Sequence, residues 1–151
     1  MSPIATRAAL LLFLVSAPGC TSKLPEGNEE IKGKIDGEEL TLRAPPGAKM
    51  AVEKNGFELK WGNCCSLSVI PGSTPIGCGS DKDCKVLSSG PGWSVTETMF
   101  HGSKLVSGSM VRKQGLAEFY CNASANGSAP DVERLTKACE TASLRNATPR
   151  R

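Results

Sequence analysis

The chain has a single histidine, His101, and few aromatic residues, which make up 5% of its 151 residues. Active sites are built from paired titratable groups or from nucleophiles beside bases, and one histidine leaves little for such an arrangement. His101 precedes Gly102 in a pair that is typical of a turn, so we interpret it as a surface residue and not as a general base. The chain also lacks a G-x-S-x-G motif and a phosphate-binding loop. These absences favour a non-enzymatic protein; the alternative is an envelope enzyme or enzyme accessory whose site the sequence does not reveal.

The chain also lacks a strong excess of positive or negative charge. The 18 Lys and Arg residues and 15 Asp and Glu residues give a formal net charge of +3, and they are dispersed along the chain. Proteins that bind nucleic acids concentrate basic residues on one face. We therefore expect no nucleic-acid partner.

No stretch reaches the roughly 18 apolar residues of a transmembrane helix. The longest apolar run, residues 8–17, follows Arg7 and would span only about 15 Å as a helix, half of a bilayer core. A short apolar run behind a positive charge is typical of a signal peptide. We expect residues 1–19 to be a signal peptide that is removed on export.

This apolar run ends in Ala17-Pro18-Gly19-Cys20. The motif resembles the lipobox of bacterial lipoproteins, although Ala17 and Pro18 stand where that family usually has Leu and Ala or Ser. The resemblance covers the first 20 residues and implies diacylglycerol on Cys20 with cleavage just before it. Such lipid would hold the protein in a membrane of the cell envelope, at the outer membrane or its periplasmic face. The alternative is a secreted, soluble protein without lipid.

Cysteines are the most informative residues of the remaining chain. If Cys20 carries lipid, an even number remains, which allows up to three disulfides in an oxidising compartment. The chain has no C-x-x-C motif, and adjacent cysteines are unsuited to the usual zinc sites. Residues 78–84 carry two aspartates but lack the other ligands of a calcium loop. We expect no metal and no cofactor, and a disulfide role for Cys64, Cys65, Cys78, Cys84, Cys121 and Cys139.

Two turn signals organise the first part of the domain. Asp36-Gly37 separates two short segments, residues 31–35 and 39–44, of which the second alternates like a half-buried strand. Asn55-Gly56 is a strong signal for a type I′ hairpin. Folding about it pairs Val52 with Leu59 and Met50 with Trp61, which puts four apolar residues on one face. Residues 63–86 lack periodicity and predict a long, disulfide-tied loop with a short strand at 66–70.

The next part of the chain predicts three consecutive antiparallel strands, at residues 93–100, 103–113 and 116–123. The turns between them are expected at His101-Gly102 and Gln114-Gly115. The first turn sets Trp93 opposite Met110 and Val95 opposite Gly108. The second sets Met110 opposite Phe119 and Gly108 opposite Cys121. One face is then apolar, apart from Glu97, which falls opposite Val106.

A helix follows Ser128, which resembles an N-cap with Pro130 in the first turn. An apolar stripe at helical spacing consists of Val132, Leu135, Ala138, Cys139 and Ala142. Since Cys139 lies on this stripe and Cys121 on the apolar sheet face, we predict a disulfide between them. By elimination, Cys64 and Cys65 pair with Cys78 and Cys84 in an order left open.

The expected fold is α+β: an antiparallel sheet of about five to six strands with one C-terminal helix on one face, stapled by disulfides. Residues 20–30 would form a lipid-anchored flexible tether, residues 31–145 a single domain and residues 146–151 a frayed tail. The architecture resembles small sheet-plus-helix lipoproteins of the bacterial envelope, a likeness that carries no function. We expect a lipid-anchored envelope protein that binds a partner protein, a cell-wall polymer or a small ligand.

Overall fold

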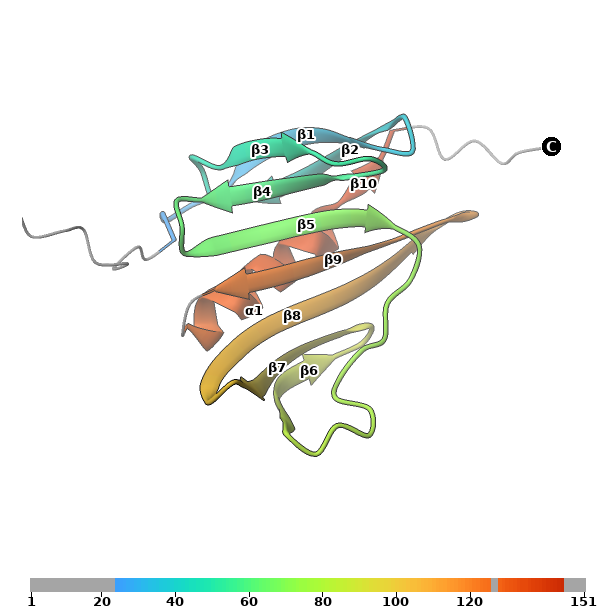
Figure 1. The fold of residues 1–151 in the computed structure, drawn as a ribbon. Helices are drawn as coiled ribbons and strands as arrows, with labels where there is room; N and C mark the ends of the chain where they lie inside the picture. The colour runs from blue at the N-terminus through green and yellow to red at the C-terminus, as the bar shows by residue number, and fades with distance from the viewer. Residues whose placement is uncertain (1–23, 126–127, 146–151) are drawn as a thin grey trace, which may run out of the picture.

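The computed structural model describes residues 24–125 and 128–145. This part of the chain forms antiparallel strands and one α-helix, arranged as a large sheet, a small sheet and a helix that lies against the large sheet (Figure 1). The predicted signal peptide, Cys20 and the tail 146–151 lie outside the described residues.

The large sheet has seven strands in the order β3-β4-β5-β9-β8-β7-β6, and the small sheet has three in the order β1-β2-β10. The expectation of about five to six strands is therefore too low, although the antiparallel sheet and the C-terminal helix are confirmed. The strands that the sequence did not reveal are β6, which has no clear alternation, and β10, which has only two residues. The strand bounds are β1 Glu29–Ile35, β2 Glu38–Ala44, β3 Lys49–Val52, β4 Phe57–Trp61, β5 Cys65–Pro71, β6 Cys84–Gly90, β7 Trp93–Phe100, β8 Ser103–Gln114, β9 Ala117–Ala125 and β10 Ser143–Leu144.

The first hairpin turns where the sequence predicts. Asp36 and Gly37 have φ angles of 48° and 79°, and Ile35 pairs with Glu38. Positive φ at both central residues is the signature of the type I′ turn, which suits the right-handed twist of paired strands.

The second hairpin differs from its prediction by two residues of register. Val52 pairs with Phe57, not Leu59, and Met50 pairs with Leu59, not Trp61. Gly56 does not take the positive φ of a type I′ turn. A Cβ at Gly56 would instead collide with the backbone carbonyl oxygen of Val69 on β5. This glycine therefore permits a close approach between the β3–β4 turn and β5, and the turn is made by the longer loop 53–56.

The β7–β8 pairing is confirmed. Trp93 lies opposite Met110 and Val95 opposite Gly108. Glu97 does lie opposite Val106, and its carboxylate reaches Lys104 Nζ at 3.4 Å with both side chains partly exposed. The sheet is thus open to water at this end.

The β8–β9 pairing is shifted by two residues from its prediction. Met110 lies opposite Cys121, not Phe119, and Gly108 lies opposite Ala123, not Cys121. The reason is the turn, because Gly115 has φ 60° and is its first central residue, as in a type II′ turn. Because side chains alternate between faces with a period of two residues, a shift of two residues keeps each side chain on its predicted face. The predicted apolar face is therefore still correct.

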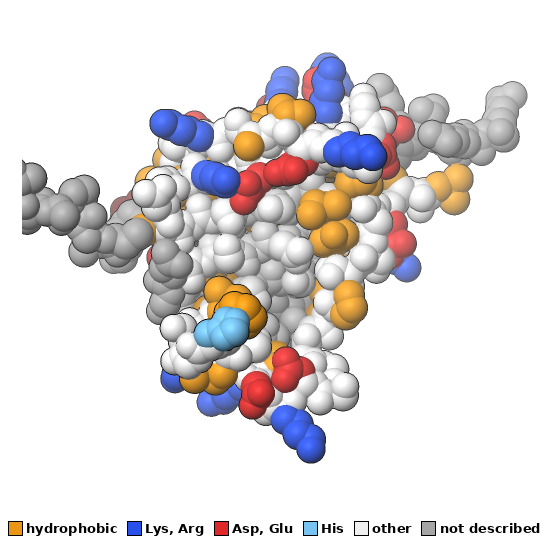
Figure 2. Space-filling view, viewed as in Figure 1, with side chains coloured by type: hydrophobic (Ala, Val, Ile, Leu, Met, Phe, Trp, Pro, Cys, Tyr) orange, Lys and Arg blue, Asp and Glu red, His pale blue; other side chains and the backbone are white. Residues whose placement is uncertain are grey.

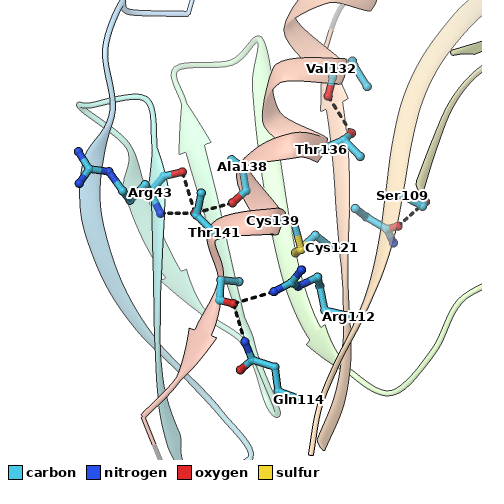
Figure 3. Close-up of a disulfide and its surroundings, with 12 residues drawn as sticks. Arg43, Ser109, Arg112, Gln114, Cys121, Val132, Thr136, Ala138, Cys139 and Thr141 are labelled. Atoms are coloured by element: carbon cyan, nitrogen blue, oxygen red, sulfur yellow. Dashed lines mark hydrogen bonds between the residues drawn. A yellow bond between two sulfur atoms is a disulfide. The ribbon is translucent and has the colours of Figure 1, made fainter. Parts of the chain in front are cut away.

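Helix α1 (Ala129–Ala138) packs on that apolar face. The Ser128 hydroxyl caps the helix by accepting a hydrogen bond from the Asp131 N–H at 3.3 Å. The helix continues as a 3-10 turn, η1 (Cys139–Thr141), in which Cys139 is fully buried. The predicted Cys121–Cys139 disulfide is confirmed, with a Cα–Cα distance of 6.2 Å. It links the C-terminal end of the helix covalently to β9 (Figure 3).

The C-terminal segment ties the three layers together. The Gln114 side chain donates to the Ala142 carbonyl at 2.9 Å and accepts from the Leu144 N–H at 2.8 Å. The Thr141 hydroxyl accepts from the Arg43 N–H at 2.7 Å and donates to the Ala138 carbonyl (Figure 3). Side chains of β8 and η1 thus hold the small sheet against the helix.

The domain also begins earlier than expected. Leu24 belongs to the core and is 4% exposed. Arg134 Nη2 donates to the Gly27 carbonyl oxygen at 2.7 Å, and β1 begins at Glu29. Leu24, the Gly27 carbonyl and the start of β1 thus contact the domain, although residues 25–30 are exposed.

Candidate functional site

The second face of the large sheet has no helix over it. In the view of Figure 2 its centre is white, without the orange and charged colours that surround it. Strands alternate their side chains between faces, so the residues between the buried ones of β5, β7, β8 and β9 must emerge here. We call this surface the hydroxyl face and define it by Ser66, Ser68, Thr96, Ser107, Ser109, Asn122 and Ser124.

Strand register arranges these side chains as two rows that run across the strands. In the first row Ser66 lies beside Ser124, which lies beside Ser107, followed by Thr96. The hydroxyls of Ser66 and Ser124 are 2.9 Å apart, and those of Thr96 and Ser107 are 3.5 Å apart. The outer neighbours at each end of the row are therefore within hydrogen-bond distance of one another.

The second row is equally regular. Ser68 lies beside Asn122, and Asn122 lies beside Ser109. The Ser109 hydroxyl donates to Asn122 Oδ1 at 2.8 Å. Each hydroxyl can donate once and accept twice, so these internal bonds leave hydrogen-bonding capacity that faces outward.

The hydroxyl face is hollowed, and the loop between β5 and β6 forms one wall. The hollow has a volume of about 370 Å³. It is lined by the members of the two rows on β5, β9 and β8, by Gly108 and Ala123 between them, and by Thr74 of that loop. The Gly77 N–H donates to the Ser94 hydroxyl at 2.8 Å, which leaves Ser94 only 2% exposed. The loop is thus held down on the sheet.

A disulfide between Cys78 and Cys84, with a Cα–Cα distance of 5.5 Å, closes this loop. The predicted pairing of these two cysteines with Cys64 and Cys65 is therefore wrong. Positive φ angles at Gly77 and Gly79 let the chain turn back on itself within this short segment. The prediction by elimination assumed that all four cysteines form disulfides, whereas Cys65 is a free thiol.

Cys65 is a buried free thiol. It begins β5 on the core side, where burial, and then the negative charge of Asp131, raises the pKa of the thiol. Cys64 bonds with neither Cys78 nor Cys84. Because Cys65 is free, the even cysteine count no longer supports lipid on Cys20, and that expectation rests on the lipobox alone.

Two borders of the hydroxyl face differ in chemistry. On one side Ile70, Tyr120 and Val111 form a third row of half-buried side chains. On β4 the Lys60 ammonium lies 3.1 Å from the Glu58 carboxylate, so these two charges offset each other. The lining of the hollow itself contains no charged side chain.

His101 lies at the exposed tip of the β7–β8 hairpin with φ 47°. Its ring meets Phe100 edge-on, with 4.3 Å between ring centroids. Over the described ranges 24–125 and 128–145, no group of three or more His, Cys, Asp or Glu residues could hold a metal ion. The structure thus places the one histidine away from the hydroxyl face hollow.

A second hollow of about 610 Å³ lies beside α1, and its lining includes Arg43, Arg134, Lys137 and Glu133. Lys137 Nζ is 2.7 Å from the Glu133 carboxylate, and Ser88 donates to the same carboxylate at 2.9 Å. These hydrogen bonds lower the pKa of Glu133, and the Glu133 partner raises the pKa of Lys137. Lys137 also lies 5.0 Å above the Trp93 ring. In this second hollow, Glu133 and Lys137 therefore help to hold α1 against β6 and β7.

Comparison with known proteins yields no match to any family model, any curated protein or any solved structure. No helix in the described part of the chain is long and apolar enough to cross a membrane.

The sequence analysis missed the hydroxyl face, although a signal for it was present. Serine and asparagine alternate with apolar residues along 66–70, 107–111 and 120–124. Alternation was used only to find the buried side of each strand. The polar side became recognisable when the register aligned three such segments.

Proposed function

We propose that the mature chain is a non-enzymatic binding module of the bacterial cell envelope, held there by lipid on Cys20, with the hydroxyl face as its binding surface. The observation that carries this proposal is the pair of hydroxyl rows in an open hollow. Helix and small sheet cover the opposite face of the same sheet (Figure 1). A surface this regular and this lightly charged offers hydrogen bonds to a ligand.

The chemistry of the face supports binding over catalysis. A serine becomes a nucleophile only when an adjacent base takes its proton. The hydrogen bonds that join Ser66 to Ser124 and Ser109 to Asn122 have hydroxyl and amide partners, which are not bases.

The two disulfides support a compartment outside the cytoplasm, since such bonds persist in oxidising surroundings. The loop disulfide bears on function as well, because it closes residues 78–84 directly after Gly77, whose N–H is bound to Ser94, and so constrains the loop that carries Thr74 to the hollow. A preformed wall spares the ordering cost that a mobile loop would pay on binding.

Co-sedimentation of the purified mature chain with isolated murein sacculi tests the proposal. We expect the wild-type chain to sediment with sacculi and Ser109→Lys to lose about tenfold in affinity, equivalent to about 1.4 kcal/mol. The matched control is Ser143→Lys, at an exposed serine of β10 in the small sheet. Ser109→Ala, which adds no bulk, is a second variant in case the lysine disturbs the fold. Equal sedimentation of all four proteins would overturn the proposal.

A further inference from the structure

We infer that the hydroxyl face binds an uncharged, hydroxyl-rich polymer: a neutral glycan chain that lies across β5, β9 and β8, the three strands that line the hollow. This inference rests on the proposed function and names the class of its ligand. Its support is the lining of the hollow, in which side-chain hydroxyls and one carboxamide are the only polar side-chain groups.

The absence of charge in this lining selects for a neutral ligand. An ionic group that enters the hollow would give up water for hydroxyl partners without meeting an opposite charge, which is unfavourable. The charged residues of the adjacent strand β4, Glu58 and Lys60, already pair with each other. Sugar hydroxyls both donate and accept, as do the serines, so each can match the capacity that the rows leave unused.

The spacing of the rows fits a chain of sugar rings. Neighbouring strands lie about 4.8 Å apart, close to the length of one sugar unit in an extended glycan. A glycan perpendicular to the strands would therefore present one ring to each strand in turn. The two rows are separated by two residues along a strand, about 7 Å, so they can contact opposite edges of each ring.

The third row lies outside the lining of the hollow, two residues further along the strands, and borders the proposed site with more apolar side chains. A pyranose ring has polar edges and faces covered by C–H groups. Tyr120 lies between Ile70 and Val111 in the register, beside the row that contains Asn122. Its ring offers an apolar surface, and its phenol offers a further hydrogen bond.

A peptide ligand is disfavoured by the place of these strands in the sheet. Extended peptides bind sheets by adding a strand to a free edge, where main-chain groups are unpaired. The three strands that line the hollow are internal, because β4 and β7 flank them in the seven-stranded order. The surface therefore offers side chains alone, which suits a ligand that carries its own hydroxyls.

Isothermal titration of the mature chain with chitohexaose, a neutral hexasaccharide, tests this ligand class. We expect measurable binding, competition with sacculi, and a loss of about tenfold in affinity for Tyr120→Ala, the fold-change that corresponds to about 1.4 kcal/mol. Val52→Ala, at an 86% exposed residue of edge strand β3, is the control and should bind as wild type. Ser109→Ala should weaken binding without a change in bulk at the sheet.

The outcomes separate the two proposals. If Ser109→Lys loses sacculus binding but chitohexaose neither binds nor competes, the proposed binding function is supported and the glycan inference is rejected. Competition by the wall's stem peptide alone would overturn the inference in the same way. If sacculus binding is indifferent to Ser109 and Tyr120, the proposed function falls together with the inference.

Discussion

Gly108 of β8 lies directly beneath Thr136 of α1. A Cβ on Gly108 would collide with the Thr136 hydroxyl and press on Val132, so the absence of a side chain sets how closely the helix approaches the sheet. The contact lies on the covered face, between the paired residues Val95 and Ala123.

We therefore expect Gly108→Ala to destabilise the fold by about 1–3 kcal/mol, the usual cost of overpacking. Thr136→Ala removes the clashing hydroxyl, so the double variant should recover part of the loss. Urea unfolding of the two single variants and the double variant measures this coupling. Strictly additive effects would show that the helix is not seated on Gly108.

The two disulfides should differ in their effect on stability. Cys121 and Cys139 are 18 residues apart and buried, and loop-closure entropy assigns such a bond about 3 kcal/mol. Cys78 and Cys84 are only six residues apart in a surface loop, for which the same relation gives about 2 kcal/mol.

Replacing each pair by alanine tests this difference. We expect the Cys121/Cys139 variant to lose more free energy of unfolding, because it also loses buried sulfur contacts. The Cys78/Cys84 variant should keep more of its stability yet bind sacculi less well, since the wall of the hollow is released. Equal binding by that variant would exclude a role for the loop.

The contact between Glu133 and Lys137 predicts a pH dependence of stability. The pKa of Glu133 is lowered in the folded state, so its contribution is complete above its unfolded pKa, near 4.5, and is lost as pH falls through the lower folded value. Both groups are well exposed, so Glu133→Gln should cost less than about 1 kcal/mol at pH 7. Urea unfolding should show this difference at pH 7 and progressively less of it as the pH falls below 4.5. A difference that grows with acid would contradict the assigned direction.

Lipid on Cys20 predicts the mass of the mature N-terminus. We expect intact-mass and peptide spectrometry of the membrane-extracted protein to find a chain that begins at Cys20 and carries a diacylglycerol thioether. An unmodified N-terminus at Pro18 or Thr21 would indicate the secreted alternative. A disulfide that joins Cys20 to Cys64 would equally exclude the lipid.

Local signals in the sequence predicted most of the elements but not how they are aligned. The β7–β8 register follows from His101-Gly102 because both residues take positive φ. The β8–β9 register was predicted wrongly because Gly115 could be either the first or the second central residue of the turn. The two choices give registers that differ by two residues. Asn55-Gly56 failed because Gly56 is needed where it meets Val69, a contact made through tertiary packing.

The candidate site was less predictable for the same reason. The Cys121–Cys139 bond follows from two apolar faces that must meet, and it was found. The hydroxyl face depends on the alignment of three strands and on a loop folded over them, neither of which is local in sequence. Cys78–Cys84 required knowing that Cys65 stays buried as a free thiol.

The most direct test of the binding surface is a ¹H–¹⁵N chemical-shift titration of the mature chain with chitohexaose. We predict that the largest amide shifts fall on the members of the two rows that line the hollow: Ser66, Ser68, Ser107, Ser109, Asn122 and Ser124. Shifts centred on Glu133, Arg134 and Lys137 would place the ligand beside α1 and contradict it, as would a spectrum that chitohexaose leaves unchanged.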